Sequence, residues 1–295
     1  MRHAVLGAGG VGGLVGGALA KAGNPVTLLV RTGRRDLYPG RLSVRSETLG
    51  AFEAPVQVAD LLDGHFDVVW ITVKATALEA ALRAVPPEKL GDSVLVPLLN
   101  GVDHVERLRG RYGAERVLPG TIRVEAEQIG PGRVRHLSAF ADVQVAPRPA
   151  TRARAEALCE ELRGAGLGCE VREDEVTMLW SKLCFLAPFA LATTASEGPL
   201  GVVRSDPGWW TRLEGCVKEA CAVAVAEGAK VAPEPILAAF EGAPNGFRSS
   251  MQKDVAAGRP PEVEAIAGPI LHGGTEHGID VSATRALVDR IVALE

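Results

Sequence analysis

Three glycines near the start of the chain have the spacing of a nucleotide-binding turn. Gly7, Gly9 and Gly12 lie in LGAGGVGG, a G-x-G-x-x-G pattern that follows the short apolar stretch HAVLG. In such a turn the first glycine permits the tight bend, the second lets the backbone approach a pyrophosphate, and the third lets a helix pack closely against the strand. A helix to about Lys21 and a second strand, PVTLLV, complete the unit. This order of strand, glycine loop, helix and strand predicts a dinucleotide-binding fold.

The same opening stretch has two other interpretations, a signal peptide and a membrane helix. Arg2, the uncharged run at 4–20 and the small residues ALA at 18–20 imitate a secretory signal. A membrane span needs about 20 strongly apolar residues, whereas this run is shorter and seven of its residues are glycine. Only the nucleotide-binding interpretation accounts for every residue. It requires that the stretch stays in the mature protein, and it predicts a cytoplasmic protein outside the membrane.

A basic segment follows the second strand. In dinucleotide-binding folds the residues at this position distinguish NAD from NADP. An NAD site usually places Asp or Glu there to bind the ribose 2′-hydroxyl, but this chain has Arg31, Thr32, Arg34 and Arg35. A guanidinium forms charge-assisted hydrogen bonds with a 2′-phosphate, which a carboxylate would repel. We therefore expect NADP(H) with Arg31 as the contact. At least one of Arg34 and Arg35 is expected to lie on a solvated loop.

Two further polar residues follow apolar runs that are typical of buried parallel strands. FDVVWITVKA contains Lys74 near its end and DSVLVPLLNG ends at Asn100-Gly101, with the helical pattern TALEAALRAV between them. Ligands of open α/β sheets bind beyond the carboxyl ends of the strands. We therefore expect the glycine loop, Arg31, Lys74 and Asn100 to meet at one edge of a sheet.

A lysine in a long apolar helix is the other candidate for chemistry. The stretch EVTMLWSKLCFLAPFALATTA at 175–195 is strongly apolar, and Lys182 is the one charge in its middle. The side chain either snorkels to the surface, the simpler interpretation for an isolated lysine, or lines a cleft. In a cleft, partial desolvation would lower its pKa toward neutrality and make it a better proton donor.

Composition narrows the classes of function. The chain has 295 residues, 47% of them hydrophobic, and a net charge of −4 without a long run of one sign. This charge argues against nucleic acid as the main partner. Five cysteines without C-x-x-C spacing favour reduced thiols. No group of His, Cys and Asp has the spacing of metal ligands, so we expect no metal.

The predicted elements divide into two domains. Residues 1–172 alternate strands and helices, with ERVLPGTI, RVRHLS and DVQVAP as further strands, the last ones antiparallel, then a helix with its N-cap at Thr151 and a closing strand, CEVRE. In residues 173–295 the strand signals stop and helical segments follow, with Pro188 expected to bend the first of them. The predicted fold class is α/β, with an N-terminal Rossmann domain that binds a dinucleotide and an all-helical C-terminal domain.

Along nearly its whole length the chain resembles the ketopantoate (2-dehydropantoate) 2-reductase family. The matching pieces are LGAGGVGG, VKA at 73–75, LNGV at 99–102, LWSKL at 179–183, SSMQKD at 249–254 and Glu262. The resemblance implies an enzyme that uses NADPH to reduce the 2-keto group of ketopantoate, a step of pantothenate biosynthesis. It also implies an active site in the cleft between the Rossmann domain and the helical domain.

Carried over by position, the resemblance implies a role for each matched residue. Lys182 would be the general acid that polarises the carbonyl, and Glu262 would orient it and keep it charged. Ser250 would bind the substrate carboxylate. Asn100 would hold the nicotinamide end of the cofactor or the catalytic lysine, and Lys74 would flank the same spot, so both are candidates for cofactor and substrate binding. Without the resemblance, Ser250 would be a polar residue on a helix surface and Glu262 an N-terminal helix charge.

One departure from the family concerns the substrate. The family usually has asparagines one and two helical turns after the lysine, whereas this chain has Leu186 and Ala190 on the same helix face as Lys182. A site built to bind a hydroxyl loses discrimination when that partner is removed. The reaction type therefore carries over better than the substrate, and a more apolar 2-keto acid is the alternative to ketopantoate. Arg123 is either a second carboxylate anchor or a surface residue.

Two other classes of protein share these features. A related β-hydroxyacid or opine-type dehydrogenase has the same two-domain plan, and a non-catalytic NADP(H)-binding sensor would need only the nucleotide site. The combination of Lys182, Ser250 and Glu262 favours the reductase. Apolar helices such as ACAVAVA suit a core or a dimer interface, and we expect a homodimer. The direction of flux is left open by the sequence.

Overall fold

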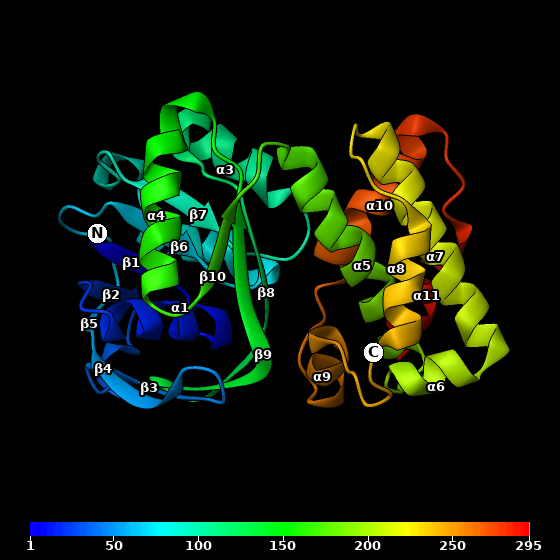
Figure 1. Cartoon of the computed structure of the whole chain (residues 1–295), viewed down its shortest axis with the longest axis horizontal. Helices are drawn as coiled ribbons and strands as arrows, with labels where there is room; N and C mark the ends of the chain where they lie inside the picture. The colour runs from blue at the N-terminus through cyan, green and yellow to red at the C-terminus, as the bar shows by residue number, and fades with distance from the viewer. Residues whose placement is uncertain (295) are drawn as a thin grey trace. The chain divides into compact units, whose positions relative to one another are not determined.

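The computed structural model describes residues 1–294 and divides the chain into two compact units (Figure 1). The first consists of Met1–Leu99 and His104–Glu175, and the second consists of Asn100–Asp103 and the chain from Val176 onward. The division after Glu175 lies three residues beyond the predicted domain boundary at residue 172.

A five-stranded parallel sheet forms the core of the first unit. Its order is β5-β2-β1-β6-β7. The strands are β1 (His3–Leu6), β2 (Val26–Leu29), β5 (Gln57–Ala59), β6 (Val68–Ile71) and β7 (Val94–Pro97). All strands except the edge strand β5 are buried at every position, which explains why they appear as near-continuous apolar runs. This sheet confirms the predicted Rossmann fold.

A second sheet in the first unit has the order β10-β9-β3-β4, with β8 also paired to β9. Its strands are β3 (Arg41–Ser46), β4 (Gly50–Pro55), β8 (Gly120–Gly130), β9 (Arg133–Val145) and β10 (Gly168–Val171). The prediction of two separate strands at RVRHLS and DVQVAP is wrong, because both belong to β9. The strand continues because a register shift against β8, between Val124 and Ala126, accommodates the extra residues between the two runs. β8 is antiparallel to β9 as expected, but β3 and β10 are parallel to it.

Helix α1 (Gly10–Lys21) packs closely against both sheets because glycines lie at the contacts. A Cβ atom at Gly12 would overlap the carbonyl oxygen of Gly7 and the hydroxyl of Thr72, and one at Gly10 would overlap the carbonyl oxygen of Ala126 on β8. No other residue type fits such contacts. The glycine-rich opening stretch therefore serves packing inside the unit, as the nucleotide-binding interpretation requires.

The other helices of the first unit are α2 (Leu78–Ala81), α3 (His104–Tyr112) and α4 (Arg152–Gly164). The helix predicted from TALEAALRAV is broken into α2 and flanking 3₁₀ turns at Ala75–Ala77 and Leu82–Ala84. Thr151 occupies the predicted N-cap position of α4, but its hydroxyl donates to the carbonyl oxygen of Arg148 at 3.2 Å and makes no capping hydrogen bond.

The cysteines differ from expectation at one pair. Cys159 on α4 and Cys169 on β10 form a disulfide, so the prediction of five reduced thiols is wrong for this pair. The contact arises because α4 and β10 pack side by side in the folded unit, which the spacing of ten residues did not reveal. Cys184, Cys216 and Cys221 are free and buried in the second unit, and burial raises the pKa of the Cys216 thiol to about 12.

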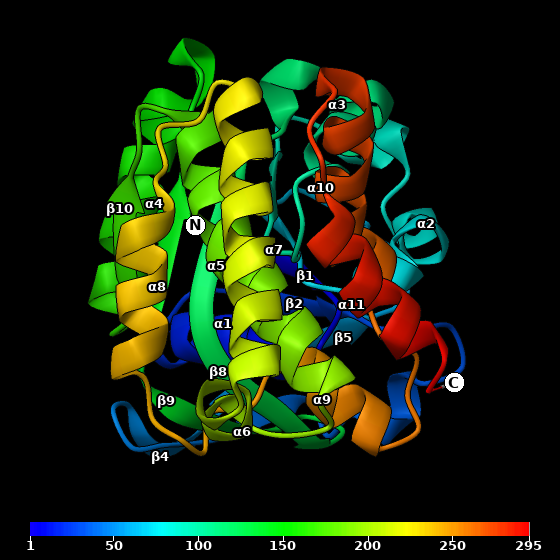
Figure 2. The ribbon, with the colours of Figure 1, turned by 90° about the vertical axis from the view of Figure 1, so that its right-hand side faces the viewer.

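The described residues of the second unit after Val176 form helices joined by loops, without a strand. Its helices are α5 (Glu175–Ala195), α6 (Leu200–Ser205), α7 (Pro207–Ala226), α8 (Pro233–Gly242), α9 (Ser250–Ala256), α10 (Val263–His277) and α11 (Ser282–Val292). Helix α7 contacts α6, α8, α10 and α11 (Figure 2). Helix α5 continues through Pro188, and the bend expected there stays a prediction.

Helix α5 is long and apolar enough to cross a membrane, judged by length and composition alone. However, 67% of its most apolar stretch is buried inside the structure. Leu183, Ala187 and Leu191 are among its fully covered side chains. A core helix that is covered on most sides has the same composition as a membrane span, so burial within this unit accounts for the apolar sequence.

We expect Gly12→Ala to lower the free energy of unfolding by about 1–3 kcal/mol, because the added methyl group forces atoms into a packed contact. Gly110→Ala is the matched control, since Gly110 lies in α3 and a Cβ atom there would meet no atom within 4 Å. Alanine at 110 should leave the stability unchanged or raise it by up to about 1 kcal/mol. Chemical denaturation of both variants measures the difference. Wild-type stability in the Gly12 variant would show that α1 can move away from the sheet at no cost.

Candidate active site

The glycine loop after β1 has the geometry of an anion-binding turn. Gly7 has a φ of +102°, which side chains disfavour, and Gly9 is the N-cap of α1 without a capping side chain. A Cβ atom at Gly9 would meet no atom within 4 Å, so the space beside the loop is open. The first amides of α1 have no carbonyl partner within the helix, and the helix dipole favours negative charge there. The loop therefore fits the pyrophosphate of a dinucleotide.

Two side chains that the sequence did not single out hold this loop. The Thr72 hydroxyl donates to the carbonyl oxygens of Leu6 at 3.0 Å and Gly7 at 2.8 Å, and Gln128 Nε2 donates to the carbonyl oxygen of Ala8 at 2.8 Å. Thr72 follows β6 directly, and β6 pairs in parallel with β1. A hydroxyl residue at the end of an apolar strand could therefore have predicted this contact with the loop after β1. Gln128 comes from β8, 120 residues along the chain, and no local pattern could place it.

The predicted cofactor residues of the first unit follow the carboxyl ends of parallel strands. β2 ends two residues before Arg31, and β6 ends three residues before Lys74. Because both strands pair in parallel with β1, these ends lie on the same edge of the sheet as the glycine loop. Both side chains are exposed. Arg34 and Arg35 are exposed as well, at a 3₁₀ turn.

Lys182 and Glu262 interact as opposite charges in the second unit. Burial lowers the pKa of Lys182 from 10.5 to about 8, and the negative charge of Glu262 opposes this shift. The residue as a whole is partly exposed, and the desolvation concerns its charged ammonium group. Glu262 is 8% exposed and is the N-cap residue of α10. A lysine with a pKa of about 8 is a stronger acid at neutral pH than an ordinary lysine.

The segment Asn100–Asp103 packs against the start of α10. Gly101 has a φ of +84°, and a Cβ atom there would overlap the carbonyl oxygen of Ala265. Val102 packs against the apolar core of the second unit. Ala265 is three residues, or about one helical turn, beyond Glu262. The close approach at Gly101 therefore brings Asn100 to the end of α10 that carries Glu262.

Two adjacent serines have different environments at the start of α9. Ser249 is the buried N-cap, and its Oγ accepts hydrogen bonds from the amide of Gln252 at 3.1 Å and from the hydroxyl of Thr193 on α5 at 2.9 Å. Thr193 is eleven residues after Lys182, which is the same face of α5 three turns later. Ser250 is exposed. The bond between Thr193 and Ser249 thus anchors α9, and Ser250 with it, to the Lys182 face of α5.

The remaining residues considered from the sequence have simpler surroundings. Leu186 is partly exposed, and Ala190 is 1% exposed. Arg123 is exposed, lies 3.7 Å from the carboxylate of Asp142 and stacks over the Phe140 ring at 5.2 Å. Its contacts are therefore with its own sheet.

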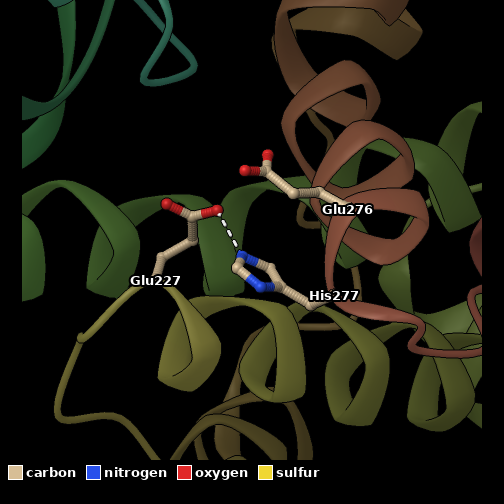
Figure 3. A group of neighbouring side chains, drawn as sticks. All are labelled: Glu227, Glu276 and His277. Atoms are coloured by element: carbon tan, nitrogen blue, oxygen red, sulfur yellow. Dashed lines mark hydrogen bonds and ion pairs between the residues drawn. The ribbon is translucent and has the colours of Figure 1, made fainter.

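A separate group of possible metal ligands lies at the carboxyl ends of α7 and α10. One ligand atom from each of Glu227, Glu276 and His277 lies within 4.8 Å of the others, and His277 Nε2 is 2.9 Å from a carboxylate oxygen of Glu227 (Figure 3). All three side chains are at the surface, and exposed acidic groups commonly gather without a metal. The hydrogen bond between His277 and Glu227 accounts for the arrangement, and we assign it no function.

Comparison with known proteins gives a consistent result over the whole chain. The family profile described as ketopantoate reductase PanE/ApbA matches residues 3–149, and the profile for the C-terminal part of the same family matches residues 175–295. The chain is 31% identical to the uncharacterized oxidoreductase YkpB of Bacillus subtilis, covering 92% of this chain and 90% of that protein. It is 30% identical to the 2-dehydropantoate 2-reductase of Caulobacter vibrioides, covering 97% and 96%.

Solved structures agree with the fold. A PanE/ApbA family ketopantoate reductase from Ralstonia eutropha superposes with a TM-score of 0.89 at 26% identity, covering 100% of this chain and 98% of that one. A D-mandelate dehydrogenase in a ternary structure with NADH and anilino(oxo)acetate gives a TM-score of 0.90 at 21% identity with the same coverage. At that identity the second likeness concerns the fold alone.

We expect the two serines of α9 to differ in their effect on stability. Ser249→Ala removes the N-cap and the partner of Thr193, and should lower the free energy of unfolding by about 1–2 kcal/mol. Ser250→Ala is the control and should change it by less than about 0.5 kcal/mol, because the side chain is exposed. Urea denaturation of both variants gives the comparison. Equal losses of unfolding free energy in the two variants would mean that the Ser250 side chain also stabilises α9.

Proposed function

Because the chain belongs to the ketopantoate reductase family of oxidoreductases, we propose that it reduces a 2-keto acid to the 2-hydroxy acid with NADPH. The observation that carries the proposal is Lys182, whose pKa is lowered to about 8 in an apolar helix and supported by the charge of Glu262. Ketopantoate is the leading substrate, since the Caulobacter relative is a 2-dehydropantoate 2-reductase. This substrate would place the protein in pantothenate biosynthesis.

The first unit supplies the cofactor site of this proposal. Gly7, Gly9 and Gly12 shape a loop whose amides bind the pyrophosphate, and Arg31 pairs with the 2′-phosphate that distinguishes NADPH from NADH. Lys74 flanks the nicotinamide end. When bound, the nicotinamide supplies the hydride.

Lys182 supplies the proton in the proposed reaction. As hydride reaches the carbonyl carbon, negative charge builds on the carbonyl oxygen, and a cationic donor aimed at that oxygen stabilises the transition state more than the ground state. The ammonium group of Lys182 then gives up a proton, which completes the hydroxyl group. Glu262 favours the charged form of Lys182 against the desolvation that disfavours it.

Other groups position the substrate and the acid. The hydroxyl of Ser250 donates to the substrate carboxylate, which fits its exposed place at the start of α9. The amide of Asn100 holds either the nicotinamide or the Lys182 ammonium, which fits the packing of its segment against α10. We propose a cytoplasmic protein that forms a homodimer; a ketopantoate reductase of Staphylococcus aureus with the same fold is dimeric.

A second candidate is a dehydrogenase of the same fold that acts on a more apolar keto acid. Leu186 and Ala190 favour it, because neither side chain can hydrogen-bond a polar substrate. The fold likeness to a D-mandelate dehydrogenase is compatible with this alternative. A sensor that binds NADP(H) without catalysis would retain cofactor binding but show no turnover.

The first test is oxidation of NADPH, followed at the nicotinamide absorbance, with ketopantoate and a panel of branched and straight 2-keto acids. NADH serves as the cofactor control. We expect turnover with NADPH, and we expect Lys182→Ala to lower kcat by about 10²–10⁴-fold while NADPH still binds, because a general acid contributes on that scale. Full activity in the variant would contradict the mechanism. Bound NADPH without turnover of any keto acid would favour the sensor.

The pH dependence of kcat/KM tests the charge pair. The active form carries a protonated Lys182, so kcat/KM should fall as the pH rises through about 8. Glu262→Gln removes the charge that raises the Lys182 pKa, so the falling limb should move to lower pH. Glu264→Gln is the matched control, because Glu264 is on the same helix with a side chain that is 76% exposed. If the falling limb stays at the same pH in the Glu262 variant, Glu262 does not influence the pKa of the catalytic acid.

A further inference from the structure

The face of α5 that follows Lys182 is a surface of hydrocarbon side chains. Phe185, Leu186 and Phe189 lie three, four and seven residues after Lys182, which is the spacing of one helical stripe. Phe185 and Leu186 are partly exposed, and Phe189 is 4% exposed. The part of the stripe that a ligand can touch beside Lys182 is therefore formed by Phe185 and Leu186.

Ring contacts hold this stripe in place. The Phe185 ring stacks on Phe240 at 4.5 Å, and the Phe189 ring stacks on Phe247 at 4.4 Å. Phe240 is completely buried. Since each ring packs against a second ring in the core, the two phenylalanine side chains have little freedom to move, and the stripe remains apolar when a polar group approaches.

Polar groups further along the stripe are already engaged. Ala190 has no polar side-chain atom. The hydroxyl of Thr193 is buried and donates to the carbonyl oxygen of Phe189 at 2.6 Å and to Ser249 Oγ at 2.9 Å. A ligand hydroxyl placed on the stripe would lose its hydrogen bonds to water and find no side-chain partner on α5 in exchange.

We infer that the site prefers 2-keto acids whose branched chain beyond the keto group is hydrocarbon over acids whose branched chain carries a hydroxyl. The inference rests on the proposed reaction, with the keto oxygen at Lys182 and the carboxylate at Ser250, and it departs from the ketopantoate preference that the relatives suggest. Because α9 is tied to α5 through Thr193 and Ser249, a ligand that contacts both Lys182 and Ser250 lies along the stripe. Its remaining substituent then packs against Phe185 and Leu186.

A pair of substrates that differ by one hydroxyl tests this preference. Ketopantoate is 3,3-dimethyl-2-oxobutanoate with a hydroxyl on the fourth carbon, so the two acids have the same branching and the same keto acid group. We expect kcat/KM with NADPH to be about tenfold or more higher for 3,3-dimethyl-2-oxobutanoate, the ratio that follows from one unpaired hydroxyl. Equal kcat/KM values for the two acids, or a higher value for ketopantoate, would overturn the inference, and this test needs no variant.

Leu186→Asn supplies a carboxamide at the centre of the stripe. It should move the kcat/KM ratio of the two acids toward ketopantoate by about tenfold or more. Leu271→Asn is the matched control, since Leu271 is also a partly buried leucine of the same unit and lies nine residues from Glu262, on the opposite side of α10. An unchanged ratio in a folded Leu186 variant, or an equal change in the control, would also overturn the inference. Failure of wild-type protein to reduce either acid would instead contradict the proposed reaction.

Discussion

The proposed chemistry of this protein depends on keeping a positive charge on a lysine that its surroundings desolvate. Burial is the larger influence and lowers the pKa of Lys182, whereas the carboxylate of Glu262 raises it. A fully exposed lysine would keep a pKa near 10.5 and would be a weak acid at neutral pH. A desolvated lysine without a nearby carboxylate would favour the neutral amine, which has no proton to give. The two helices that carry these residues belong to one densely packed unit, so the balance is set by packing. The apolar residues of α5 therefore help to set the pKa of the proposed acid.

The first unit meets a different constraint, which is the close approach of backbone to backbone. Helix α1 fits between two sheets because Gly10 and Gly12 have no side chains at the contacts. The same short distances fix where α1 begins, and hence where its free amides point. Thr72 and Gln128 then hold the carbonyl oxygens of the loop. The candidate anion site is thus built from main-chain atoms that side chains hold in place.

The elements that could be predicted from the sequence are those whose signals are local. The glycine turn, the buried strands and the apolar helix around Lys182 each follow from periodicity and spacing within about twenty residues. The missed features are contacts between distant segments. Gln128 reaches the glycine loop from another sheet, Cys169 meets Cys159 only after α4 and β10 have packed, and β9 is continuous because of irregular pairing with β8. Ser249 and Ser250 show the same limit. They are adjacent in sequence, but Ser249 is buried and bonded to Thr193 of another helix, whereas Ser250 is exposed.

In the proposed site, the apolar stripe beyond Lys182 affects both the pKa of the lysine and the preference for one substrate over another. Hydrocarbon at Phe185 and Leu186 provides no hydrogen bonds for the ammonium group of Lys182 and adds to the apolar surroundings that lower its pKa. The same hydrocarbon offers nothing to a substrate hydroxyl. Polar amides on this face would stabilise both the ammonium and a hydroxyl, and they would leave less for Glu262 to offset. In the proposed site, leucine and alanine at these positions therefore act on two properties together: they favour a less polar substrate, and they leave Glu262 as the group that opposes the desolvation of Lys182.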